Sequence, residues 1–268
     1  MENMTETTFE QMVQEQLENG QTLLDLENKG VSSSELERLG KMDRFSQVRK
    51  LYLSHNELTD DDLFPFQEME GSLHSLYLNS NLIGDAGAHT LAQSPIMSTV
   101  KCLMLEANGL GPEGAQALAD SPHFQNLEEL FLDANPIGAN GVLALSRSAN
   151  FPSLKALHLD STGMGDGGVI ALANTSTLRG LERLYLCSNH IGNIGALALA
   201  RSEPLKTLRV LSIWRNEIRD EGGEAFITSP TFDNLERLYM SLNLIERPVR
   251  KKIRGSALAQ RLQTLVMD

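Results

Sequence analysis

The sequence has few cysteines and no long apolar segment. Two cysteines, Cys102 and Cys187, occur among 268 residues, which excludes a disulfide-rich scaffold and fits a reducing compartment. No apolar run reaches the roughly 18 residues that a membrane-spanning helix needs. The first residues, Met1-Glu2-Asn3, carry an acidic side chain, and no apolar core of a secretory signal follows them. We therefore expect a cytoplasmic protein without a membrane span.

Aromatic and basic residues are also scarce. Aromatics make up 5% of the chain, and 35 Asp and Glu outnumber 23 Lys and Arg, which gives a formal net charge of −12. An acidic chain with few aromatics argues against a nucleic-acid-binding groove. The sequence also lacks a phosphate-binding P-loop, a G-x-S-x-G elbow and an H-E-x-x-H helix. We expect no enzyme activity, no cofactor and no metal site.

Leucine is abundant instead, with 44 residues, and it recurs in a fixed pattern. The motif L-x-x-L-x-L-x-x-N-x-I/L-G repeats with one step of 25 residues and then steps of 27. Its asparagines are Asn56, Asn81, Asn108, Asn135, Asn189, Asn216 and Asn243, with Thr162 in the one missing place. Over about residues 20–268 this pattern resembles the leucine-rich repeat family, in its ribonuclease-inhibitor-like subtype. The resemblance implies a protein-binding architecture.

Each repeat combines a segment in which leucines alternate with polar residues and a segment with a helical pattern. The alternating leucines predict short strands that stack in parallel, and the residues after the motif glycine predict a helix. Strands inside and helices outside predict an α/β right-handed solenoid, an open horseshoe arc with a parallel concave sheet and convex helices. We expect Asp85, Asp166 and Asp220, which stand at the helix starts, to cap their own helices. Thr162 has a hydroxyl but lacks the asparagine amide, so the seam at Thr162, meaning the hydrogen-bonded junction between its repeat and the neighbouring repeats, should be weaker.

Both ends of the stack need covers. We expect residues 1–19 to form an N-terminal tail and capping helix, residues 20–246 the repeats, and residues 247–268 a C-terminal basic cap and last strand. Nothing in the sequence follows this strand to cover its edge, and an uncovered edge pairs readily with another copy. One hypothesis is therefore a homodimer through the C-terminal edge strand. The other is that the basic segment folds over that edge.

Two columns of strand residues face the concave side, because side chains alternate along a strand. All four tyrosines stand in one column, and the only tryptophan stands in the next. Tyr and Trp dominate protein-binding hot spots, whereas stacking between strands would only stiffen the sheet. With the charged residues beside them, the candidate partner-binding residues are Tyr52, Tyr77, Met104, Glu106, Phe131, Asp133, His158, Asp160, Tyr185, Trp214, Arg215 and Tyr239.

Charge is unevenly distributed along this face. The residues that predict an acidic middle are Glu106, Glu129, Asp133 and Asp160, and those that predict a basic region nearer the C-terminus are Arg183, Arg215 and Arg237. This division favours a protein partner with a basic surface. His158 and Cys187 lie on adjacent strands but should be about 8 Å apart, too far for a nucleophile and its base.

Two other functions stay open. The leucine-rich-repeat activators of Ran-type GTPases share this repeat class, so the resemblance also implies a regulator of a small GTPase. None of their active residues can be assigned to a position in this sequence, which ends in a basic segment rather than an acidic tail. The second alternative is an effector exported without a Sec signal, for which residues 1–6 are the only candidate export segment.

Overall fold

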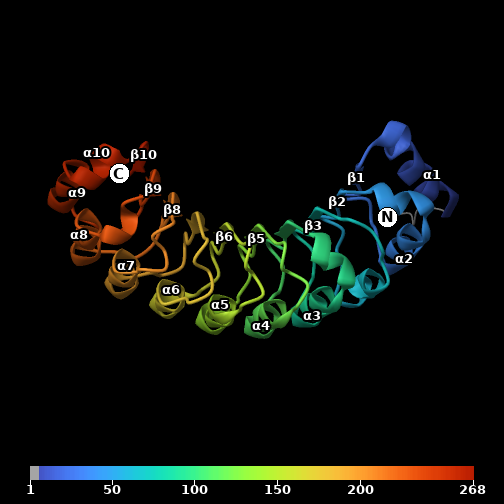
Figure 1. Ribbon diagram of the computed structural model, residues 1–268, viewed down its shortest axis with the longest axis horizontal. Helices are drawn as coiled ribbons and strands as arrows, with labels where there is room; N and C mark the ends of the chain where they lie inside the picture. The colour runs from blue at the N-terminus through green and yellow to red at the C-terminus, as the bar shows by residue number, and fades with distance from the viewer. Residues whose placement is uncertain (1–5) are drawn as a thin grey trace.

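Ten parallel strands line the inner side of an open arc in the computed structural model, which describes residues 6–268. They follow one another in the sheet in their order in the chain, and the helices lie on the outer side (Figure 1). The strands are β1 (Leu23–Asp25), β2 (Lys50–Tyr52), β3 (Ser75–Tyr77), β4 (Cys102–Met104), β5 (Glu129–Phe131), β6 (Ala156–His158), β7 (Arg183–Tyr185), β8 (Val210–Ser212), β9 (Arg237–Tyr239) and β10 (Thr264–Val266). The predicted arc with a concave parallel sheet and convex helices is confirmed.

Neighbouring strands pair in the same register along the whole sheet. Leu51 lies beside Leu76 across the step of 25 residues, and Leu76 lies beside Leu103 across a step of 27. The central leucine of every strand from β1 to β9 is buried. Equal positions of successive repeats therefore form columns, as the sequence period predicts.

The outer side is helical in every repeat, but the kind of helix varies. The repeat that follows β2 is two residues shorter than the others and carries a 3-10 helix, η3 (Asp61–Gln67), with Pro65 inside it. The α-helices are α1 (Glu6–Gln16), α2 (Ser33–Lys41), α3 (Asp85–Gln93), α4 (Pro112–Asp120), α5 (Gly138–Arg147), α6 (Gly165–Ala173), α7 (Asn193–Ala200), α8 (Asp220–Ile227), α9 (Arg247–Arg254) and α10 (Ala257–Arg261). The shorter 3-10 helices are η1 (Glu18–Gly20), η2 (Asp43–Gln47), η4 (Pro95–Thr99) and η5 (Pro230–Phe232).

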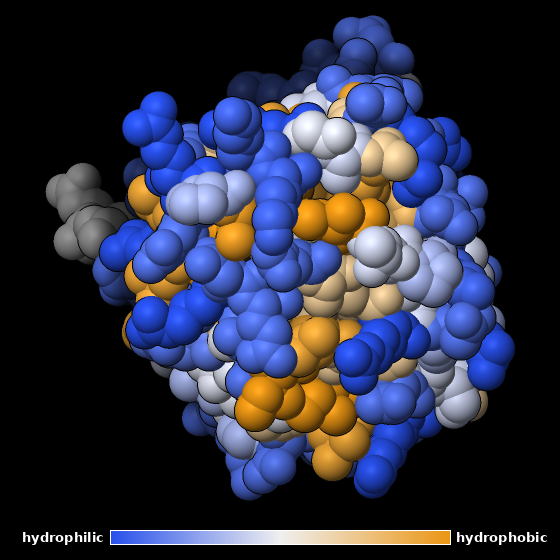
Figure 2. All heavy atoms as spheres, turned by 90° about the vertical axis from the view of Figure 1, so that its left-hand side faces the viewer, coloured by the Kyte–Doolittle hydropathy of each residue, from blue (hydrophilic) through white to orange (hydrophobic). Residues whose placement is uncertain are grey.

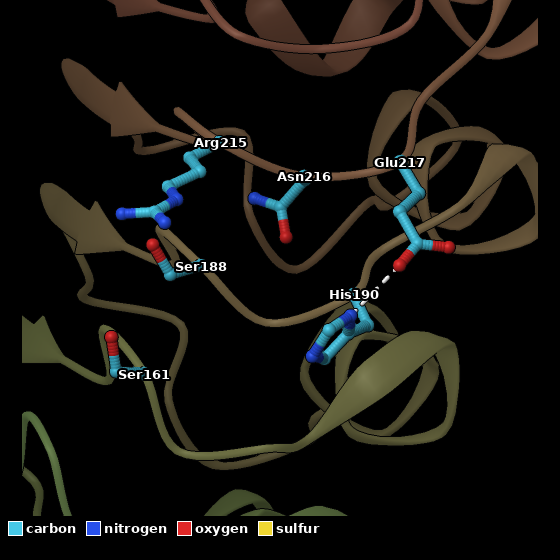
Figure 3. Close-up of a pocket in the computed structure, with 6 residues that line it drawn as sticks. All are labelled: Ser161, Ser188, His190, Arg215, Asn216 and Glu217. Atoms are coloured by element: carbon cyan, nitrogen blue, oxygen red, sulfur yellow. Dashed lines mark hydrogen bonds and ion pairs between the residues drawn. The ribbon is translucent and has the colours of Figure 1, made fainter.

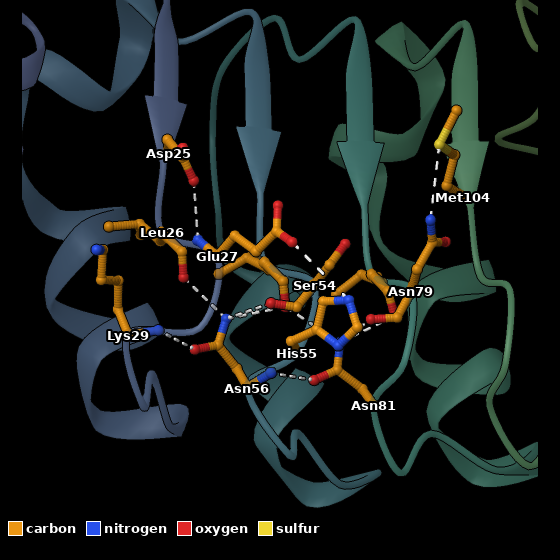
Figure 4. A network of polar contacts seen from close by, with 12 residues as sticks. Asp25, Leu26, Glu27, Lys29, Ser54, His55, Asn56, Asn79, Asn81 and Met104 are labelled. Atoms are coloured by element: carbon orange, nitrogen blue, oxygen red, sulfur yellow. Dashed lines mark hydrogen bonds and ion pairs between the residues drawn. The ribbon is translucent and has the colours of Figure 1, made fainter.

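The repeated asparagines join successive loops. The Nδ2 group of Asn81 donates to the carbonyl oxygens of Leu53 and Leu78 at 3.1 and 2.9 Å. Its Oδ1 accepts from the backbone N–H groups of Asn56 and Leu58 at 2.9 and 3.0 Å. Figure 4 shows Asn56 making the same kind of contact with the loop before it. One side chain thus satisfies backbone groups that would otherwise be buried without partners.

The seam at Thr162 is built differently. Thr162 Oγ1 donates to the carbonyl of Leu159 and to Oδ1 of Asn189, both at 3.0 Å, and so bonds its own loop and the following repeat. The loop before it bonds instead through Gly138, whose N–H donates to the backbone carbonyl of Thr162. Gly138 adopts a left-handed φ of +59° there, a conformation that glycine accepts at low cost. The side-chain link to the preceding repeat is missing, and the backbone hydrogen bond from Gly138 takes its place; the weaker contact between these repeats stays a prediction.

The prediction that three aspartates cap their own helices is wrong. Oδ1 of Asp85 accepts from the N–H groups of Gly111 and Gly114, both at 2.7 Å, at the start of the following helix, α4. Asp166 binds the start of α7 in the same way, and Asp220 accepts from Glu246 before α9. Parallel helices one repeat apart place each carboxylate at the N-terminus of the next helix, where the helix dipole and free N–H groups favour an anion.

Replacing Asp166 by alanine should lower the free energy of unfolding by about 1–2 kcal/mol, because the start of α7 loses two charge-assisted hydrogen bonds. Urea denaturation followed by circular dichroism measures this change. Glu113→Ala is the matched control, since this exposed acid also lies in the first turn of a helix but its side chain forms no hydrogen bond within residues 6–268. An equal loss in both variants would show that only the helix dipole is involved.

The two ends are covered by different elements. At the N-terminus Phe9 and Val13 of α1, together with Leu17 just after it, lie in the core. The tail expected before it, at residues 1–5, lies outside the described residues. At the C-terminus the basic segment forms α9 with Pro248 in its first turn, then α10, and β10 ends the sheet.

Candidate protein-binding face

The aromatic column forms stacks between neighbouring strands. Tyr52 and Tyr77 stack with ring centroids 4.0 Å apart and planes at 5°. His158 lies between Phe131 and Tyr185, at 3.8 and 4.1 Å from their rings. All five rings are half-buried at the concave surface rather than beneath the sheet. In-register strands hold equal positions close to the stacking distance, so the sheet itself explains part of this column.

The column is interrupted at two places. Met104 separates the tyrosine pair from the three-ring stack, and Ser212 separates Tyr185 from Tyr239. Ser212 is buried and its hydroxyl lies 3.0 Å from the sulfur of Cys187. Tyr185 and Tyr239 therefore stand two strands apart, roughly 9.6 Å, with only a small buried residue between them.

The acidic residues of the second column reach toward the backbone of the next repeat. Oδ1 of Asp133 accepts from the N–H of Asp160 at 2.5 Å, and Oδ1 of Asp160 accepts from the N–H of Cys187 at 2.7 Å. These carboxylates thus form a second ladder beside the asparagines. Burial, with the charges of Asp160 and Glu106, raises the pKa of Asp133 to about 7. Burial also raises the pKa of Asp160.

His158 and Cys187 do not form a catalytic pair. Burial, and then the charge of Arg183, lowers the pKa of His158 to about 4, so the ring is neutral at pH 7. Burial raises the pKa of the Cys187 thiol to about 11, and its sulfur contacts Ser212 rather than His158. A thiol that stays protonated is a poor nucleophile, so these residues act as parts of the sheet.

The predicted division into acidic and basic regions is reduced by one ion pair. Arg183 in β7 places Nη2 2.5 Å from Oε1 of Glu129 in β5. The two side chains meet above Ala156 of β6, which is too small to separate them. The basic residues that remain on the C-terminal side of the face are Arg215 and Arg237, neither of which forms an ion pair within residues 6–268.

A shallow hollow of 450 Å³ opens at the edge of the face beside Arg215. Figure 3 shows the hydroxyls of Ser161 and Ser188 on the same side as the Arg215 guanidinium, and His190 joined to Glu217 at 2.7 Å. Of these residues, only Arg215 is among the twelve partner-binding residues predicted from the sequence. Ser161, Ser188 and Arg215 occupy the same repeat position, where the backbone has a left-handed φ of 55–57°. Their 27-residue spacing is the feature of the sequence from which the two serines could have been placed beside Arg215.

Trp214 directly precedes Arg215, which lines this hollow, and is 39% exposed. Among the twelve candidates it is the one large hydrophobic side chain that is exposed. By contrast, Tyr52, Tyr77, Phe131 and Tyr185 are stacked and half-buried, and Tyr239 is half-buried without a stacking partner in residues 6–268. The most accessible of the twelve candidates are therefore Trp214 and Arg215, in the loop that follows β8.

Within residues 6–268 no cluster of three His, Cys, Asp or Glu side chains is placed to hold a metal ion. No helix in the same part of the chain has the length and apolar character needed to cross a lipid bilayer.

Comparisons with known proteins agree with the observed fold. A family model described as leucine-rich repeat matches residues 72–92, 97–119, 152–173, 179–200 and 205–226. The fold is a leucine-rich repeat solenoid. Among solved structures, an internalin of Listeria monocytogenes is similar, with a TM-score of 0.54 and 20% sequence identity over 88% of this chain. The chain spans 65% of the length of that internalin. A search of curated protein sequences finds no match.

Proposed function

We propose that this protein is a non-enzymatic scaffold that holds a partner protein on its concave face. Leucine-rich repeat proteins generally act in protein–protein interaction. The observation that carries the proposal is the exposed Trp214, which lies two residues after Ser212, the residue between Tyr185 and Tyr239, and directly before the exposed Arg215. Rigid aromatic residues beside arginine are the side chains that contribute most to protein interfaces.

The gap above Ser212 gives this region a specific shape. Tyr185 and Tyr239 leave roughly two stacking distances between them, so one planar side chain of a partner fits above Ser212. The carboxylates of Glu106 and Asp160 lie further along the same face and favour a partner with basic residues on that side. The 27-residue period and the α-helix in most repeats support the ribonuclease-inhibitor-like subtype.

The double variant Trp214→Ala/Tyr239→Ala should capture about tenfold less partner than the wild type in native cross-linking followed by mass spectrometry, because it removes two anchors of the face. Tyr52→Ala is the matched control, since it removes a tyrosine from the same column at the far end. Equal recovery by all three proteins, with unchanged thermal melting, would contradict the proposal.

The other functions lead to different experiments. A regulator of a small GTPase would bind in a nucleotide-dependent manner, and an exported effector would be recovered outside the producing cell. No contact within residues 6–268 favours either function, and both stay predictions. We propose a cytoplasmic location, which the two free cysteines support; cell fractionation tests it.

A further inference from the structure

The N-terminal edge of the sheet is closed by a side chain of α1. Nε2 of Gln16 donates to the carbonyl oxygen of Asp25 at 2.8 Å, and the N–H of Asp25 donates to Oε1 of Gln16 at 2.7 Å. The glutamine amide thus occupies the outward-facing donor and acceptor of β1 in the way that a neighbouring strand would. An edge blocked in this way cannot pair with another chain.

The C-terminal edge is covered only in part: the Arg254 guanidinium of α9 donates to the carbonyl oxygen of Met267, and no side chain of residues 6–268 covers the backbone of Leu265. The N–H of Thr264 bonds to Glu236, and the carbonyl of Val266 accepts from Met240, so these residues bond toward β9. In a parallel pair the residue between them points its N–H and C=O the other way. For Leu265 this is the outer edge, where no group of residues 6–268 forms a hydrogen bond with its backbone.

The end of the solenoid is also apolar. Figure 2 looks at this end and shows apolar side chains in its middle, bordered by hydrophilic ones. The last strand contributes Val266, which is 40% exposed, and the half-buried Leu265. Half-buried Leu262 precedes that strand, and Leu242 and Leu244 in the repeat before it are exposed.

We propose that a second copy of this chain pairs with β10 in the antiparallel direction, about a two-fold axis at Leu265. In this arrangement each Leu265 N–H donates to the Leu265 carbonyl of the other copy, so the free donor and acceptor satisfy one another. The two sheets become continuous, and the concave face of each copy stays open. This dimer is independent of the partner on the concave face.

The side chains are compatible with this register. Val266 lies opposite Thr264 of the second copy, and Asp268 lies opposite its Leu262, next to its Arg261. Asp268 and Arg261 are both exposed and carry opposite charges; within one copy Arg261 pairs with Asp233, and Asp268 accepts from the hydroxyl of Ser241. The pairing therefore joins the apolar middle of the two ends and brings opposite charges together at its border.

Sedimentation velocity from low to high micromolar concentration tests the proposal. We expect the wild type to shift from 29.5 kDa to twice that mass. Val266→Lys should weaken the dimer about tenfold or more, since lysine on an edge strand opposes pairing. Asp25→Lys is the matched control, because it places lysine at the same repeat position of β1, whose edge Gln16 already covers.

Hydrogen exchange on the wild type gives a readout that needs no variant. The amide of Leu265 should exchange more slowly as the protein concentration rises, and the amide of Leu23 should not change. A wild type that stays at 29.5 kDa, equal association of both lysine variants and the wild type, or a Leu265 amide that is insensitive to concentration would each overturn the proposal.

Discussion

Replacing Asn189 by alanine is expected to lower the free energy of unfolding by about 3–5 kcal/mol, the largest loss of stability that we predict for any single substitution. The Nδ2 group of this buried residue donates to the carbonyls of Leu159 and Cys187, and its Oδ1 accepts from the N–H and hydroxyl of Thr162. Alanine leaves these groups buried without partners. Equilibrium unfolding in urea measures the loss.

Asn174→Ala is the control for this prediction. Asn174 is exposed at the end of α6 and forms one side-chain hydrogen bond, to Ile170 of its own helix. Its replacement should change the free energy of unfolding by less than about 1 kcal/mol. Similar losses in the two variants would show that the asparagine ladder does not support the stack.

Asp133 should make the protein less stable as the pH rises from about 4 to about 7. The pKa of this carboxyl is about 7 in the folded protein and near 3.8 without the fold. Between these values the folded state binds more protons than the unfolded state, so the free energy of unfolding falls with increasing pH. A difference of about three pKa units corresponds to about 4 kcal/mol at pH 8, and solvent screens little of it because the side chain is only 19% exposed.

Asp133→Asn tests this dependence and keeps an oxygen that accepts from the N–H of Asp160. We expect the variant to be more stable than the wild type at pH 8, and this gain should disappear near pH 4. Both proteins carry His158, whose pKa of about 4 makes the fold less stable as the pH falls below 6.5, so the difference between them isolates Asp133. Parallel pH profiles would contradict the prediction.

The repeat architecture could be predicted from the sequence, because the same residue pattern recurs in every repeat. A leucine at the centre of each strand and an asparagine in each loop fix the register, so Tyr52, Tyr77 and Tyr185 could be assigned to one column before any coordinates. The substitution of Thr162 in one motif likewise located the altered seam.

The candidate face was predicted less completely. Its columns follow from the alternation of side chains along a strand, but the contacts within them depend on the length and direction of each side chain. Arg183 reaches Glu129 across two strands because Ala156 is small, and this contact joins residues 54 positions apart in the chain. Asp133 was expected to face a partner, yet its carboxylate accepts from the next repeat.

The sequence by itself determined the period, the order of strands and helices, and the set of residues that share the concave surface, since these depend on local pattern and repetition. Only the tertiary structure decided which helix each aspartate caps, which aromatic residue remains exposed, and which sheet edge is closed by Gln16. These features depend on the distance between neighbouring repeats and on the reach of individual side chains, and neither quantity is encoded in the repeat motif.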